Sequence, residues 1–151
     1  MLLAKLPALP ACVSRRPACL RGTITVRAAT REDIASLRVL GADFFDSEAE
    51  IEAYLRADGL MLYAFRAEEP FGAGVVMRVT PGRDDFDIGM VVHPEQRRRG
   101  HGAHIIGHLK AWCLERGWRP ICECAFDNVA SQGALRRAGF AARDRLVEFR
   151  M

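Results

Sequence analysis

The sequence has very little lysine and no long apolar run. Only Lys5 and Lys110 are lysine, so nearly all of the 22 basic residues are arginine, and the formal net charge is only +3. No apolar stretch approaches the roughly 20 residues that a membrane-spanning helix needs. Nucleic-acid-binding proteins spread many basic residues over a face, so this mild charge does not indicate one. With 50% hydrophobic residues in a chain of 151, the composition fits one compact domain outside the membrane.

The cysteines do not indicate a disulfide scaffold, and the histidines do not indicate a metal centre. The five cysteines form an odd set in a chain long enough to need no disulfides, which favours a reducing, cytoplasmic compartment. Cys122 and Cys124 alternate along an expected strand, where small thiols usually pack into a core. His101, His104 and His108 share one flank of an expected helix, exposed or half-buried, and no third ligand is evident. We therefore expect no metal.

The first residues differ from the rest of the chain. Residues 1–22 are apolar at first and then basic, and three prolines interrupt them. The order is wrong for a secretion signal, because Arg15 and Arg16 follow the apolar part. A transit peptide stays open, since no acidic residue precedes Glu32. We expect a disordered N-terminal extension over 1–22 and one domain over 23–151.

Strand and helix signals alternate through that domain. Helices are expected after the capping patterns Thr30 to Asp33 and Ser47 to Glu50, and Gly117 and Gly139 stand where two later helices should end. Strands are expected over 23–27, 60–65, 71–79, 87–92 and 121–125, with one short strand at the end. Early hairpins followed by strand-helix-strand crossovers predict an α/β fold with a mixed sheet.

The segment from Asp87 to Gly117 says most about function. A short apolar strand enters a turn rich in arginine and glycine, which opens a helix. The first turn of a helix leaves N–H groups unpaired and carries partial positive charge, so an anion binds there readily. Gly100 and Gly102 have no Cβ to hold a phosphate away, and the arginines at 97–99 add charge. This pattern predicts a pyrophosphate site.

These residues resemble the GNAT N-acetyltransferases, whose acetyl-CoA loop reads Arg/Gln-x-x-Gly-x-Gly/Ala, as 97–102 do here. Residues 128–140, an Asn-led helix closed by Gly139-Phe140, look like the second motif of the family, and the resemblance covers roughly 23–151. It implies a mostly antiparallel sheet flanked by helices, with a V-shaped splay between two central parallel strands. It also implies acetyl-CoA as acyl donor. The cofactor contacts that it implies are Met90, Val91, Val92, Arg97, Arg98, Arg99, Gly100, His101, Gly102, Ala103 and Asn128.

The resemblance also suggests catalytic groups. The N–H near Val92 is the oxyanion donor that it implies, and Asp87 is a base candidate, although a solvated residue in an acidic run is an equal alternative. Glu123 is a second base candidate. The tyrosine that protonates the leaving thiolate in many relatives is Leu135 here, and the two tyrosines, Tyr54 and Tyr63, lie outside the motif. Water can replace it, because a thiolate of pKa ~8.5 leaves readily.

The acceptor has no clear signature. Phe44 and Phe45 could line its site, although at least one of them should be buried. We expect a small-molecule or peptide amine as partner, and no nucleic acid. After Phe140 only about one strand remains, so a homodimer through a short sheet edge is a further hypothesis. The sequence thus predicts an acetyl-CoA-dependent N-acetyltransferase; an acyl-CoA sensor without turnover and a basic nucleic-acid-binding domain are the alternatives.

Overall fold

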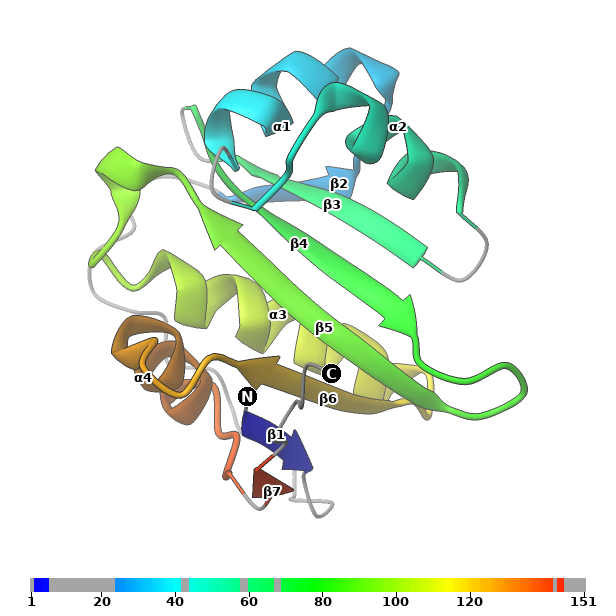
Figure 1. Ribbon diagram of the computed structural model, residues 1–151, viewed down its shortest axis with the longest axis vertical. Coiled ribbons are helices and arrows are strands. Elements are labelled where there is room, and N and C mark those ends of the chain that lie inside the picture. The colour runs from blue at the N-terminus through cyan, green and yellow to red at the C-terminus, as the bar shows by residue number, and fades with distance from the viewer. Residues whose placement is uncertain are drawn as a thin grey trace, which may run out of the picture.

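The computed structural model describes residues 2–5, 24–41, 44–57, 60–66, 69–142 and 144–145. Its strands form one mixed sheet in the order β2-β3-β4-β5-β6-β1-β7 (Figure 1). Within these residues every neighbouring pair is antiparallel except β5 and β6, which run parallel. The strands are β1 (Leu2–Lys5), β2 (Thr25–Ala28), β3 (Leu60–Arg66), β4 (Pro70–Arg78), β5 (Asp85–Val92), β6 (Arg119–Cys124) and β7 (Asp144–Arg145).

The helices begin and end at the signals expected from the sequence. The backbone N–H of Thr30 donates to Asp33 Oδ2 at 2.8 Å, and the N–H of Glu50 donates to Ser47 Oγ at 3.1 Å. Gly117 and Gly139 adopt φ of 72° and 80°, the left-handed conformation that commonly ends a helix. The helices are η1 (Arg31–Asp33), α1 (Ile34–Leu40), α2 (Glu48–Arg56), η2 (Pro94–Gln96), α3 (His101–Glu115) and α4 (Val129–Arg137).

Two buried clusters hold the helices on opposite faces of the sheet. Figure 1 shows α1 and α2 together over the β2–β4 end, and α3 passing behind β5. Alternate strand residues point to opposite faces, so Val91 of β5 joins the cluster under α1 and α2 while Ile88 joins the cluster under α3. The expected α/β fold with a mixed, mostly antiparallel sheet flanked by helices is confirmed. No helix in the described segments is both long and apolar enough to cross a membrane.

Glycines in β4 let α3 approach the sheet closely. A Cβ at Gly72 would lie 2.5 Å from Ile105 Cδ1, and one at Gly74 would lie 2.7 Å from Leu109 Cδ1. Both partners are fully buried side chains on one stripe of α3. Interiors packed at crystal density have no room for an added methyl group at such distances. The position of α3 below the sheet therefore depends on these two glycines.

The outer edge of β6 is paired within the same chain. β1 runs antiparallel to β6, with Leu3 opposite Glu123, and β7 pairs with β1 in turn. The sequence prediction had placed residues 2–5 in a disordered extension over 1–22; the structure describes them as a strand, and residues 6–22 lie outside the described residues. β1 and β7 thus extend the sheet beyond β6, and the homodimer hypothesis stays a prediction.

Two glycine substitutions should separate packing from helix propensity. We expect Gly74→Ala to lower the free energy of unfolding by roughly 1–3 kcal/mol, because its Cβ meets Leu109. Gly107→Ala on α3 is the matched control: its Cβ would meet no atom within 4 Å, so the substitution should raise stability by roughly 0.5–1 kcal/mol. Urea unfolding of both variants measures this difference; equal effects would contradict the packing assignment.

Candidate active site

The two central parallel strands pair only at their beginnings. The ladder joins Asp85 to Arg119, Phe86 to Pro120 and Asp87 to Ile121, and β5 then continues to Val92 and β6 to Cys124 without further pairing. Figure 1 shows the two ribbons together at their start and apart at their ends. Beyond Asp87, every second residue of β5 therefore turns its backbone N–H and C=O toward the unpaired space on the β6 side.

The direction of the N–H groups along β5 follows from one hydrogen bond. His93 N donates to Phe71 O of β4 at 2.9 Å. Successive N–H groups of a strand point to opposite edges, so those of Met90 and Val92 point toward β6. The carbonyl of Val92 points the same way and accepts from Arg97 Nε at 3.1 Å. The predicted cofactor residues Met90 and Val92 thus present main-chain donors at the edge where pairing has ended.

The loop before α3 contains two left-handed residues. Arg98 has φ of 63° and Gly100 has φ of 84°. Such a φ costs a residue with a Cβ roughly 1 kcal/mol or more, which explains glycine at position 100 and makes Arg98 a strained residue. From the sequence, we expect Gly100 to leave room for a phosphate. The left-handed main-chain conformation of Gly100 is a second reason for glycine at this position.

Within the described residues, no side chain caps the start of α3. Its N-cap is Gly100, with no side-chain cap, and its first turn has no acidic residue. By contrast, Ser47 caps α2 and Asn128 caps α4 through hydrogen bonds to N–H groups of the first turn. The first intrahelical bond of α3 runs from His104 N to Gly100 O at 3.1 Å. The preceding N–H groups, including that of Ala103, have no intrahelical partner.

Two of the three loop arginines hydrogen-bond within the loop. Arg97 donates to the Val92 carbonyl, as described above, and Arg99 Nη1 donates to Gln96 Oε1 at 3.2 Å. All three side chains are exposed. They raise the local positive potential, and Arg97 in addition ties the loop to the end of β5. Its role is therefore partly structural, which the sequence did not indicate.

Gly102 faces the protein interior. A Cβ there would lie 2.9 Å from Met90 Sδ and 3.5 Å from Ala134 Cβ of α4. Close packing of α3 against β5 and α4 therefore explains this glycine. Packing is thus one reason for glycine here, its N–H remains available at the helix start, and its role beside a phosphate stays a prediction.

The histidines of α3 differ from one another in burial. His101 is 6% exposed and stacks on Phe71 at 4.4 Å between ring centroids, which corrects the expectation of an exposed or half-buried side chain. Its Nδ1 has no hydrogen-bond partner among the described residues. Burial and the charge of Arg99 lower the pKa of His101. Burial also lowers the pKa of His104 and of His108. The described residues contain no group of three or more His, Cys, Asp or Glu side chains that could hold a metal ion.

The two base candidates share one face of the sheet. Cys122 and Cys124 pack on the α3 side, as expected, so Glu123 points to the opposite face, where Asp87 also lies beside Ile121. Asp87 is half-buried, and this burial together with the charge of Glu123 raises its pKa to about 6. A carboxyl group with such a pKa is ionised at neutral pH and close to its most effective range as a base.

The acidic run around Asp87 is not uniform. Asp84 is exposed, and Asp85 forms ion pairs with Arg119 and, at 3.6 Å, with Arg83. Asp87 instead has a carboxylate, Glu123, as the charged group that shifts its pKa. The alternative interpretation of Asp87 as one of several solvated carboxylates therefore does not fit its burial.

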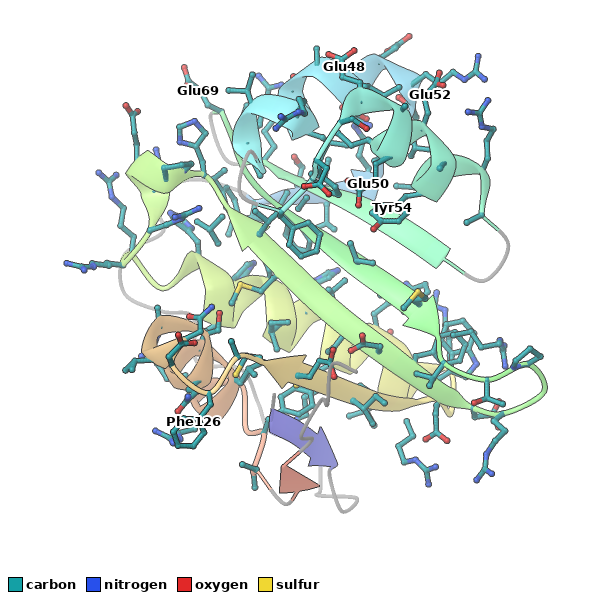
Figure 2. All side chains as sticks on the ribbon, in the orientation of Figure 1. Glu48, Glu50, Glu52, Tyr54, Glu69 and Phe126 are labelled. Carbon is teal, nitrogen blue, oxygen red and sulfur yellow. The ribbon has the colours of Figure 1, made fainter. Side chains whose placement is uncertain are left out.

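Other residues singled out by the sequence lie in structural positions. Asn128 Oδ1 accepts from Ser131 N at 3.0 Å, so it caps α4 as expected. Leu135 is buried in the core cluster below α3. Tyr54 OH donates to Glu50 Oε1 at 2.6 Å on α2 (Figure 2), and the side chain of Tyr63 lies outside the described residues. Phe45 is fully buried and Phe44 is 44% exposed, so one of the pair is indeed core.

The comparisons with known proteins decide the family. The model of the acetyltransferase (GNAT) family matches residues 29–140. The chain belongs to this family. The matched range begins just before η1, includes the uncapped start of α3 and ends at Phe140. No curated protein matches the chain.

Solved GNAT structures share the fold at low sequence identity. An acetyltransferase from Colwellia psychrerythraea superposes with a TM-score of 0.71 at 19% identity over 93% of this chain, which spans only 52% of that protein. The aminoglycoside N-acetyltransferase AAC(6')-Iy, solved with CoA, gives 0.70 at 22% identity over 87% of this chain and 97% of its own. A spermidine N-acetyltransferase from Vibrio cholerae gives 0.71 at 14% identity over 83% of each chain.

The raised pKa of Asp87 predicts how the free energy of unfolding depends on pH. A carboxyl group whose pKa is higher in the folded than in the unfolded protein lowers stability as pH rises from about 4 to above 6. We expect Asp87→Asn to raise the free energy of unfolding by roughly 1–3 kcal/mol at pH 8, with no gain at pH 3.5. Urea unfolding at both pH values measures this.

Asp84→Asn is the control for that experiment, because Asp84 is exposed in the same acidic run. Its effect should be small and similar at both pH values. A gain from Asp87→Asn that is the same at both pH values would show that the carboxyl group is not titrating in a desolvated site.

Proposed function

We propose that the protein is an N-acetyltransferase that moves an acetyl group from acetyl-CoA to a primary amine by direct attack. The observation that carries the proposal is the uncapped start of α3 beside the unpaired edge of β5, in a chain of the GNAT family. The CoA pyrophosphate binds the N–H groups at 100–103. The pantetheine arm lies along residues 90–92 of β5 in the V-shaped splay between β5 and β6 and pairs with the N–H of Met90, which leaves the N–H of Val92 for the reacting carbonyl.

Each residue proposed for the donor has a definite task. Arg97, Arg98 and Arg99 surround the phosphates with positive charge, and Arg97 also holds the loop against Val92. Gly100 provides the backbone turn, and the N–H groups of His101, Gly102 and Ala103 donate to phosphate oxygens. Val91 anchors β5 in the core on the other face. Asn128 caps α4 and stands where the second family motif begins.

The chemistry then requires few side chains. The amine nitrogen attacks the thioester carbon, and the N–H near Val92 donates to the oxygen that becomes negative. The carbon–sulfur bond breaks, and the nitrogen loses its proton to Asp87, directly or through water; burial first, and then the charge of Glu123, raise the pKa of Asp87. The leaving thiolate takes a proton from water, because buried Leu135 cannot supply one. Positioning of the two substrates contributes most of the rate enhancement.

The acceptor is a small-molecule or peptide amine; the aminoglycoside and spermidine enzymes named above are named for small-molecule amines. The protein acts in the cytoplasm. Asp87 and Glu123 lie on the α1–α2 face, so the acceptor approaches from there. Leu135 in place of a proton donor favours one competing proposal, an acyl-CoA sensor that binds without turnover. Release of free CoA in the presence of amines separates the two.

The donor site can be tested by adding a competing charge at the helix start. Ala103→Glu should weaken acetyl-CoA binding roughly tenfold or more, because a carboxylate in the first turn occupies the N–H groups and repels phosphate. Isothermal titration calorimetry measures the Kd. Ala103→Gln has the same shape without charge and should weaken binding less, while both variants should keep the wild-type Tm. Equal Kd in all three proteins would exclude this loop as the phosphate site.

The base can be tested through the pH profile of turnover. Free CoA released from acetyl-CoA with a panel of primary amines gives kcat/KM. For the wild type we expect kcat/KM to rise with pH through a limb near 6, the pKa of Asp87. Asp87→Asn should lower kcat/KM roughly 100-fold and remove that limb, whereas Asp84→Asn should keep both. A full limb in Asp87→Asn would assign the base elsewhere.

A further inference from the structure

One glycine near the proposed reaction centre has no structural explanation. Gly89 lies in the middle of β5 on the same face as Asp87 and Val91, opposite Val75 of β4. A Cβ at Gly89 would meet no heavy atom of the described residues within 4 Å. Its φ is not in the left-handed region, unlike that of Gly82, Gly100, Gly117 and Gly139. Neither packing nor backbone conformation therefore requires glycine at this position.

Glycine inside a strand carries a cost. It lowers stability by roughly 0.5–1 kcal/mol relative to a residue with a side chain, and it often marks a place where another group approaches the backbone. The glycines of β4 offset that cost by admitting side chains of α3, as shown above. Gly89 admits no part of the described protein, so the space beside it is open to a ligand.

The neighbours of this open space are those of the proposed reaction. Val91, two residues toward the loop, is covered by the buried cluster that contains Phe45. Asp87, two residues the other way, is half-buried and faces the same side. The N–H of Met90, the next residue, points toward the edge of β5 that β6 has left. Gly89 therefore lies on this face between Val91, which packs under α1 and α2, and Asp87, the proposed base.

A surface cavity elsewhere does not share these neighbours. It measures about 370 Å³ and is lined by Ala35, Ser36, Val39, Leu40, Pro70 and His93. It touches β5 only beyond its C-terminal end, six residues after Asp87. The base candidate does not line it, so it is the weaker choice for the reacting amine.

We propose that Gly89 determines the size of the acceptor: its missing side chain admits an amine carrying branches next to the nitrogen, and any larger residue at this position would restrict the enzyme to unbranched amines. The inference rests on the proposed function. It concerns which amines the enzyme accepts. Glycine at this position leaves room for amino groups on branched or ring carbons as well as on simple chains.

The test compares n-butylamine with sec-butylamine, which have the same atoms and charge and differ only in branching beside the nitrogen. The wild type, Gly89→Ala and Gly89→Val are assayed for CoA release with both amines. We expect the ratio of kcat/KM for sec-butylamine to that for n-butylamine to fall stepwise, by at least tenfold in Gly89→Val, while the Kd for acetyl-CoA changes less than threefold. Gly107→Ala, equally open but on α3, should leave the ratio unchanged.

The outcomes are distinguishable. An unchanged ratio in Gly89→Val, with acetyl-CoA binding intact, overturns this inference and leaves the proposed function standing. A wild type that binds acetyl-CoA but releases no CoA with any amine overturns both. Thermal unfolding gives a readout without turnover: Gly89→Val should keep or raise the Tm, because valine suits a strand and meets no atom here. A fall of more than about 5 °C would show that the space is not open.

Discussion

The structure depends on the early end of pairing between its two central parallel strands. A strand in the middle of a sheet normally satisfies its backbone groups on both sides, and a buried N–H or carbonyl left without a partner costs about 1–3 kcal/mol. β5 loses its partner after Asp87. The Val92 carbonyl recovers one from Arg97. The N–H groups that still point to the open edge suit an extended, amide-bearing ligand arm, and this is the reason that we propose pantetheine pairing there.

The surrounding elements keep that opening in place. β6 is held on its other side by β1, so it does not need β5 along its whole length. α3 lies close under β4 because Gly72 and Gly74 admit Ile105 and Leu109. Gly102 brings the start of the same helix against Met90. The start of α3, where we propose that phosphate binds, and the unpaired end of β5 are therefore fixed relative to each other by core packing, rather than by a loop that must close on the ligand.

The sequence could predict those features that depend on neighbours in the chain. The capping patterns at Thr30 and Ser47 set the helix starts, and the glycines at 117 and 139 ended helices as expected. Long-range arrangement was less accessible. Pairing of β1 with β6 joins residues more than a hundred positions apart, and the composition of residues 1–22 indicated disorder. His101 was expected on an exposed or half-buried flank because helical spacing alone does not show that Phe71 covers it.

The same limit applies within the candidate site. Arginines 97–99 were recognised by type, but only the fold shows that Arg97 turns back to Val92. The face of Glu123 could not be assigned from alternation until the cysteines were placed in the core. Gly89 carried a signal that was present in the sequence, a glycine inside an apolar strand, yet that signal has several meanings. Only the absence of atoms around its Cβ position separates an open site from a packing site such as Gly74.

Asp87 links the opening to the chemistry. It is the last residue of β5 that pairs with β6, so it stands where the parallel ladder ends and the backbone edge of β5 becomes available. Partial burial and the nearby Glu123 raise its pKa to about 6. At this pKa the carboxyl group is still ionised at neutral pH, and it is a stronger base than an ordinary aspartate. Asp85, two residues earlier, is neutralised by Arg119. The end of the parallel ladder therefore lies beside both the open backbone edge proposed for the donor and a carboxylate that forms no ion pair with the described residues.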